Sequence, residues 1–185
     1  MKKIFFTVFS VCMIISNYAQ NHIIENLEIN DFIDGTLLQP EEKKSKTLAI
    51  IIAGSGSTDR DGNQIAMKNN SLKQLAYFLA DQGVASFRYD KRIIKLSRNQ
   101  KYIQSQIRFE DFVDDAADVV NYFKLFEGAK YGFDKFILIG HSQGALVAQL
   151  ASLKTAVNGL ILLCGTAKPI DEVMVSQISK QAPFL

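Results

Sequence analysis

The stretch Phe136-Ile137-Leu138-Ile139-Gly140-His141-Ser142-Gln143-Gly144-Ala145 joins a short apolar run to a segment of helix-forming residues. Its centre, residues 140–144, has the pattern Gly-x-Ser-x-Gly, in which a serine occupies a tight turn between a strand and a helix. Side chains at Gly140 and Gly144 would meet neighbouring backbone. The pattern predicts that Ser142 is a nucleophile and that the N–H of Gln143, at the helix N-terminus, stabilises an oxyanion.

A second oxyanion donor is expected from the loop after an earlier strand. Residues 47–53 (TLAIIIA) form a continuous apolar run, typical of a central strand that is buried on both faces. Gly54-Ser55-Gly56 follows directly. We predict that the N–H of Ser55 is the second donor, and that Gly54 and Gly56 let the backbone approach a substrate closely.

Strand and helix patterns alternate along the chain, which predicts an α/β fold with a mostly parallel sheet and helices on both faces. A hairpin is expected over residues 23–38, with its turn at Asp34-Gly35. Further strands are expected at 47–53, 84–89, 136–139 and 157–163. Helices are expected at 71–82, capped by Ser71 and ended by Gly83, at 107–126 and at 145–154.

The N-terminus has the three-part layout of a secretory signal peptide. Lys2 and Lys3 precede an apolar run over residues 4–16, and Ala19 offers a cleavage position. We therefore expect residues 1–19 to be removed, leaving an exported protein without a stable membrane span. Cys164 would then be the one remaining cysteine, and its apolar surroundings predict a packed side chain.

Composition excludes several classes of protein. The 185 residues are 48% hydrophobic and 22% charged, with a net charge of +2, so no basic field indicates a nucleic-acid partner. Two cysteines and two histidines are too few for a disulfide scaffold or a Cys/His zinc site. The aspartates of the helix expected at 107–126 are interpreted as its solvated face rather than as metal ligands: Asp111, Asp114, Asp115 and Asp118.

Four motifs resemble the α/β-hydrolase superfamily, most of all its secreted bacterial esterases and serine aminopeptidase-like hydrolases. They are Ala53 to Asn63 (AGSGSTDRDGN), Arg88 to Arg92 (RYDKR), Phe112 to Ala116 (FVDDA) and Gly140 to Gly144 (GHSQG). The resemblance implies an acyl-enzyme on Ser142, a small-molecule acyl substrate and no cofactor. Between an ester and a peptide bond, we expect an ester.

The chain departs from the family pattern in three places. Ala53-Gly54 replaces the usual His-Gly, and residues 93–97 (IIKLS) replace a glycine-rich stretch, so an altered loop is expected there. The third departure concerns the triad, because the acid and the histidine follow the serine in this fold. No histidine follows Ser142, and neither His22 nor His141 fits the base. Asp171 and Glu172 come too early for the acid.

The missing triad partners lead us to interpret the sequence as the N-terminal part of a longer hydrolase. Residues 20–168 would then form a partial core, and residues 169–185 would begin a cap or form a truncated tail. The strand at 157–163 would be an exposed apolar edge.

Two alternatives remain open. One is a non-catalytic protein of the same fold that keeps the pocket without turnover. The other is a nucleotide-binding Rossmann-type domain, which Gly54-Ser55-Gly56 and Asp90 imitate. Asp59 stands where its third glycine is expected, and no helix follows the glycines directly, which disfavours it.

Overall fold

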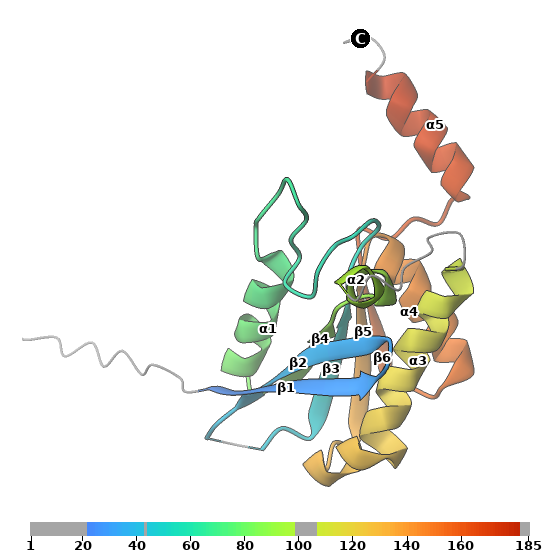
Figure 1. Ribbon diagram of the computed structural model, residues 1–185. Coiled ribbons are helices and arrows are strands. Elements are labelled where there is room, and N and C mark those ends of the chain that lie inside the picture. Colours follow the sequence, from blue (N-terminus) through green and yellow to red (C-terminus); the bar gives the residue numbers. More distant parts are fainter. Residues whose placement is uncertain (1–21, 43, 99–106, 182–185) are drawn as a thin grey trace, which may run out of the picture.

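The computed structural model describes residues 22–42, 44–98 and 107–181. They form a six-stranded mixed sheet with helices on both faces (Figure 1). The strands are β1 (His22–Asn30), β2 (Ile33–Pro40), β3 (Thr47–Ile52), β4 (Ala85–Tyr89), β5 (Lys135–His141) and β6 (Gly159–Leu163). The helices are α1 (Ser71–Asp81), α2 (Arg92–Arg98), α3 (Phe109–Leu125), the 3-10 helix η2 (Glu127–Tyr131), α4 (Gln143–Lys154) and α5 (Ile170–Gln181).

The strand order β1-β2-β4-β3-β5-β6 confirms a mostly parallel sheet. Strands β4, β3, β5 and β6 run parallel, whereas β1 and β2 form an antiparallel hairpin that joins the sheet through β2 and β4. In the register, Ile52 of β3 pairs with Gly140 of β5, and Gly140 pairs with Leu162 of β6. The loops that follow these parallel strands therefore meet at one edge of the sheet.

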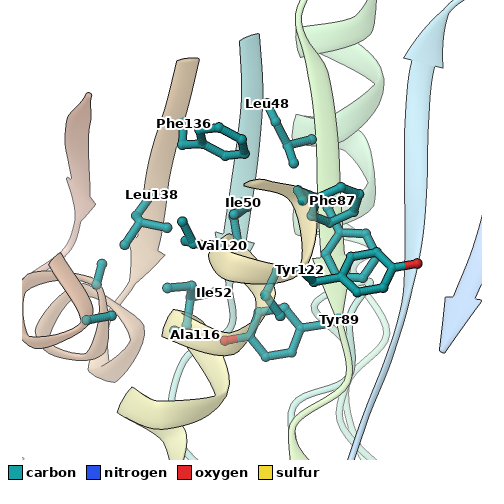
Figure 2. Close-up of a cluster of buried hydrophobic side chains, with 14 of the residues drawn as sticks. Leu48, Ile50, Ile52, Phe87, Tyr89, Ala116, Val120, Tyr122, Phe136 and Leu138 are labelled. Atoms are coloured by element: carbon teal, nitrogen blue, oxygen red, sulfur yellow. The ribbon is translucent and has the colours of Figure 1, made fainter. Parts of the chain in front are cut away.

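The apolar run of β3 is explained by cover on both faces. Leu48, Ile50 and Ile52 face a core that includes α3 and α4. Alternate residues Ala49 and Ile51 face a second core that is formed with α1. Figure 2 shows the first core, in which side chains of β3, β4 and β5 pack against those of α3.

The hairpin forms as expected, but the position predicted for its turn is wrong. The chain turns at residues 31–32, where the side-chain oxygen of Asn30 accepts hydrogen bonds from the N–H groups of Phe32 and Ile33. Gly35 lies inside β2 instead. A Cβ there would be 2.3 Å from the ring of Phe87, which explains why this strand residue is a glycine. Its small size serves packing and not a turn.

The start of α1 and the segment after Lys91 also differ from expectation. Asn70, in the left-handed conformation, is the residue before α1, and Ser71 is already helical, so Ser71 is not the cap. Gly83 ends the helix with a φ of 79°, as predicted. The altered loop expected at residues 93–97 is the short helix α2.

Strand β6 forms one edge of the sheet and has exposed apolar side chains, as predicted. Leu160, Ile161 and Leu162 are each about 40% exposed. Cys164 follows this strand with a φ of 54° and is exposed, so the prediction of a packed cysteine is wrong. It lies beside an uncovered edge strand, where the described residues provide no layer to bury it.

Helix α5 stands apart from the sheet in Figure 1, and most of its side chains are exposed. Within the described ranges, no helix is both long and apolar enough to cross a lipid bilayer. The predicted signal peptide lies outside the described residues.

Candidate active site

Ser142 occupies a strained turn between β5 and α4. Its φ of 54° and ψ of −119° lie in a region that residues with a side chain rarely adopt. The N–H of Ser142 donates to the carbonyl oxygen of Leu163 at 2.8 Å, and its own carbonyl accepts from Ala145 at 2.9 Å. The end of β6 and the first turn of α4 therefore hold this serine in place, at the edge where the parallel strands end.

The two glycines of the motif lie where side chains cannot fit, as predicted. A Cβ on Gly140 would lie 2.1 Å from the carbonyl oxygen of Gly144. A Cβ on Gly144 would lie 2.4 Å from the carbonyl oxygen of Ile52. The turn thus packs on itself and on the end of β3, and both contacts involve backbone that cannot rotate away.

The loop after β3 lies against the serine. A Cβ on Gly54 would be 3.4 Å from the Cβ of Ser142 and 3.1 Å from Nδ1 of His141. Gly56 has a φ of 72°, a conformation that favours glycine. The structure therefore brings together the two segments that the sequence singled out, residues 54–56 and residues 140–144.

Lys91 holds the carbonyl groups of this loop. Its Nζ donates a hydrogen bond to the oxygen of Gly54 at 2.5 Å and a second to the oxygen of Gly56. The residue is 5% exposed, and burial lowers the pKa of its ammonium group to about 8. The carbonyl of Ser55, between these two, accepts from the hydroxyl of Thr58 at 2.8 Å. Lys91 belongs to the sequence motif RYDKR, but no local pattern indicates a role for it.

A cavity of about 10 Å³ lies beside the end of β3. It has room for about one water molecule. Residues of α3 and α4, and residues at or just after the ends of β3 and β4, line it: Ile52, Ala53, Tyr89, Lys91, Phe112, Asp115, Gln143 and Val147. The predicted donor Gln143 and the buried Lys91 therefore border the same small space.

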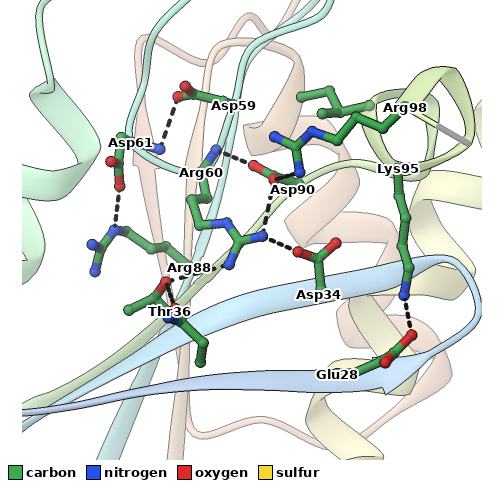
Figure 3. Close-up of polar contacts among 12 residues, drawn as sticks. Glu28, Asp34, Thr36, Asp59, Arg60, Asp61, Arg88, Asp90, Lys95 and Arg98 are labelled. Carbon is green, nitrogen blue, oxygen red and sulfur yellow. Dashed lines mark hydrogen bonds and ion pairs between the residues drawn. The ribbon is translucent and has the colours of Figure 1, made fainter.

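The rest of the loop is fastened to the end of β4 by ion pairs (Figure 3). The guanidinium of Arg60 contacts both Asp34 of β2 and Asp90, which follows β4. Arg98 of α2 donates to the same Asp90 oxygen at 2.9 Å. One residue further along the loop, Asp61 accepts from Nε of Arg88 at 2.8 Å. The motifs at residues 53–63 and 88–92 are thus joined to each other by these ion pairs.

One of the four aspartates of α3 is not solvated, contrary to expectation. Asp115 is 1% exposed and accepts two hydrogen bonds from the guanidinium of Arg92, at 2.9 and 2.6 Å. Burial raises the pKa of Asp115, although the bonds from Arg92 oppose this. Asp114 and Asp118 are exposed. Among the described residues, no three His, Cys, Asp or Glu side chains are grouped to hold a metal ion.

Neither histidine is placed as a base for Ser142. Nε2 of His22 lies 2.9 Å from Asp81, and its ring packs against Tyr77 at the far end of the hairpin. His22 is the first residue of β1 and therefore lies within the sheet. His141 is exposed and directly precedes the serine. Asp171 and Glu172 lie in the first turn of α5.

A mostly parallel sheet with a strained Gly-x-Ser-x-Gly turn at the carboxyl ends of its strands defines an α/β-hydrolase. The sequence profile of one family within this class, described as serine aminopeptidase, S33, matches residues 65–184. The chain belongs to this family.

Known relatives agree with this assignment. Esterase EstD of Thermotoga maritima is 23% identical over 148 residues, which are 79% of this chain and 33% of that enzyme. An esterase of Pyrococcus furiosus has a similar structure, with a TM-score of 0.58, 13% identity and coverage of 89% of this chain and 57% of that one. A dienelactone hydrolase of Anabaena variabilis gives a TM-score of 0.57, 12% identity and coverage of 79% and 64%.

These structural likenesses establish the fold alone, because their identities are low. The chain spans a third of the length of the curated esterase and less than two thirds of each of the two structures.

Proposed function

We propose that the protein is a serine hydrolase in which Ser142 forms an acyl-enzyme. The observation that carries the proposal is the strained Ser142, held at the N-terminus of α4 with the Gly54 loop against its Cβ. This strain is maintained by the contacts of Gly140 and Gly144, and strained residues of this kind cluster at active sites.

In the proposed reaction, Oγ of Ser142 attacks the carbonyl carbon of the substrate. The carbonyl oxygen becomes negatively charged and accepts hydrogen bonds from the N–H groups of Ser55 and Gln143. The tetrahedral species then expels the alcohol, which leaves with the proton that the hydroxyl of Ser142 gave up in the attack, and an ester remains on Ser142. Water attacks this ester, releases the acid and restores the hydroxyl.

The substrate we propose is a small carboxylic ester. The relatives named above as esterases support an ester, whereas the description of the family names an aminopeptidase. Comparison of p-nitrophenyl esters with aminoacyl p-nitroanilides decides between them. Faster turnover of the anilides would contradict the ester proposal.

A second candidate is a non-catalytic protein of this fold. It is favoured by the positions of the two histidines, since His22 pairs with Asp81 and His141 neighbours the serine in the chain. A serine hydroxyl without a base is a weak nucleophile. The catalytic proposal therefore requires a general base other than these two histidines.

A fluorophosphonate probe tests the proposal on the protein as its native gene produces it. We expect labelling that is lost in Ser142→Ala and kept in Ser152→Ala, a serine ten residues further along α4. Absence of labelling in a folded sample would favour the non-catalytic candidate. The same sample tests the proposed export, because removal of residues 1–19 would start the mature chain at Gln20 in its intact mass spectrum.

A further inference from the structure

We propose that Lys91 is a positioning residue that orients the peptide group between Gly54 and Ser55. The inference rests on the proposed function, in which the N–H of Ser55 is an oxyanion donor. It assigns to Lys91 the task of fixing where this N–H points.

Lys91 fixes the orientation of the peptide group between Gly54 and Ser55 through its carbonyl. In a trans peptide the carbonyl and the following N–H point in opposite directions. The carbonyl of Gly54 points to Nζ of Lys91, at 2.5 Å. The N–H of Ser55 therefore points away from Lys91. A rotation of this peptide group would break the bond to Lys91 and turn a carbonyl oxygen toward the place of the N–H.

Lys91 contacts two carbonyl groups and not one. Its bond to the carbonyl of Gly56 fixes a second peptide group, on the other side of Ser55. The ammonium therefore holds the backbone both before and after Ser55. Gly54 and Gly56 have no side chains to restrict their backbone, and Gly56 has a positive φ. A loop of this composition needs external bonds to keep one conformation, and a charged donor supplies stronger ones than a neutral donor.

The burial of Lys91 beside this loop has a cost in protein stability. The residue is 5% exposed, and its ammonium donates two hydrogen bonds to carbonyl oxygens. The centre of the Phe112 ring lies 5.8 Å from Nζ. A buried ammonium without a carboxylate partner is unfavourable for stability. Such a residue is typical of a site where function, and not folding, fixes the side chain.

The surroundings of Lys91 make its protonation a test. Burial lowers its pKa to about 8. Burial raises the pKa of Tyr89 on β4, and Asp115 on α3 is paired with Arg92. The residues that α4 adds to the shared cavity, Gln143 and Val147, carry no charge. Loss of the proton from Lys91 should therefore weaken the hold on the loop as the pH rises through about 8.

The first experiment compares the native gene product with its Lys91→Met and Lys95→Met variants. Lys95 is the matched control, because it lies one helical turn away and pairs with Glu28, outside the site. Backbone ¹⁵N relaxation of selectively labelled serines should give Ser55 an order parameter of about 0.85 in the wild type and in Lys95→Met. In Lys91→Met it should fall below ~0.6. An unchanged value in Lys91→Met would overturn the proposal.

The second readout needs no variant. The amide resonance of Ser55 in the wild type should shift with a midpoint near pH 8, and Lys91→Met should lack this transition. A wild-type amide that does not respond between pH 6.5 and 9.5 (a range of roughly 1.5 pH units about that midpoint) would contradict the proposal even if Lys91→Met failed to fold.

The third readout is kinetic and separates the two proposals. Loss of one oxyanion donor lowers kcat by about 10²–10³-fold, so Lys91→Met should show a fall of this order with little change in KM. If Lys91→Met loosens Ser55 but the wild type has no reactive serine, the proposed function fails and the orienting role of Lys91 stands. If the wild type is active and Lys91→Met keeps its kcat, the orienting role fails.

Discussion

The carboxylate of Asp90 accepts two hydrogen bonds from Arg60, one from its backbone N–H at 2.7 Å and one from its guanidinium at 2.9 Å. Asp90 is 1% exposed and directly follows β4, whereas Arg60 belongs to the loop after β3. One buried side chain therefore fixes both the backbone and the side chain of a residue thirty positions earlier.

This contact predicts that Asp90→Asn destabilises the protein by about 3 kcal/mol, because a buried charge is removed from its partners. Urea unfolding at pH 7 measures the change. Asp114→Asn is the control, since Asp114 and its partner Lys154 are both about half exposed and the expected loss is below about 0.5 kcal/mol.

The same pair sets a dependence on pH. Burial by itself raises the pKa of Asp90, but the bonds and charge of Arg60 and the charge of Arg98 outweigh it and hold this pKa below its ordinary value. The stabilisation is therefore present at neutral pH and is lost as the pH falls through the lowered pKa. The difference between the wild type and Asp90→Asn should shrink in acid, and a constant difference would contradict this account.

Arg92→Met should leave Asp115 buried without its cation. We expect a loss of about 3–5 kcal/mol at pH 7. The pKa of Asp115 is already raised by burial and should rise further in the variant, so the loss should diminish as the pH is lowered and the carboxyl takes up a proton. The double variant Arg92→Met/Asp115→Asn should be more stable at pH 7 than Arg92→Met alone. Equal stabilities would show that the unpaired charge is not the cause.

Gly144→Ala should destabilise the protein by about 3 kcal/mol, since its Cβ meets backbone that cannot move without disturbing β3. Gly159→Ala is the matched control. Its Cβ would lie 3.1 Å from the end of the flexible Ile137 side chain, so a smaller loss is expected in the same unfolding experiment.

Ser142→Gly should unfold at a higher temperature than Ser142→Ala. Both variants lack the hydroxyl, but only glycine adopts the φ of 54° without a steric penalty. Strain of this kind is worth about 1–3 kcal/mol. Scanning calorimetry compares the two midpoints, and a lower midpoint for Ser142→Gly would indicate that the turn stores no strain at this residue.

Lys91 predicts opposite trends in stability and in loop order. Burial lowers its pKa from 10.5 to about 8, so between these values the unfolded chain binds more protons than the folded one. The free energy of unfolding of the wild type should therefore rise relative to that of Lys91→Met as the pH increases from about 8 to 10.5. Chemical denaturation at several pH values tests this. A fall over the same range would mean that the ammonium stabilises the fold.

The central strands and the serine turn could be predicted from the sequence, because the patterns that indicate them are local. The apolar run of β3 and the glycines around Ser142 follow from burial and from steric limits that act within a few residues. The interpretation of Asp34-Gly35 failed for a different reason. A glycine indicates either a turn or a close approach, and only the neighbouring Phe87 decides between them.

The buried charges could not be predicted, because their partners are distant in the chain. Asp115 shares a helix with exposed aspartates, and Arg92, which donates hydrogen bonds to it, lies 23 residues away. Lys91 contacts carbonyl groups 35 and 37 residues earlier. Carbonyl acceptors belong to every residue, so no pattern in the sequence marks those that a lysine will use. The outcome depends on how β3 and β4 align.

The side-chain anchors of the loop after β3 have a consequence for protein engineering. Residues 54–61 are held by three side chains at the end of β4 and just after it, those of Arg88, Asp90 and Lys91. Asp34 adds a contact from the hairpin. A chimaera that exchanges this loop alone between homologues would carry a segment without its supports. The transferable module is the loop together with the end of β4, and successful grafts should move both as one piece.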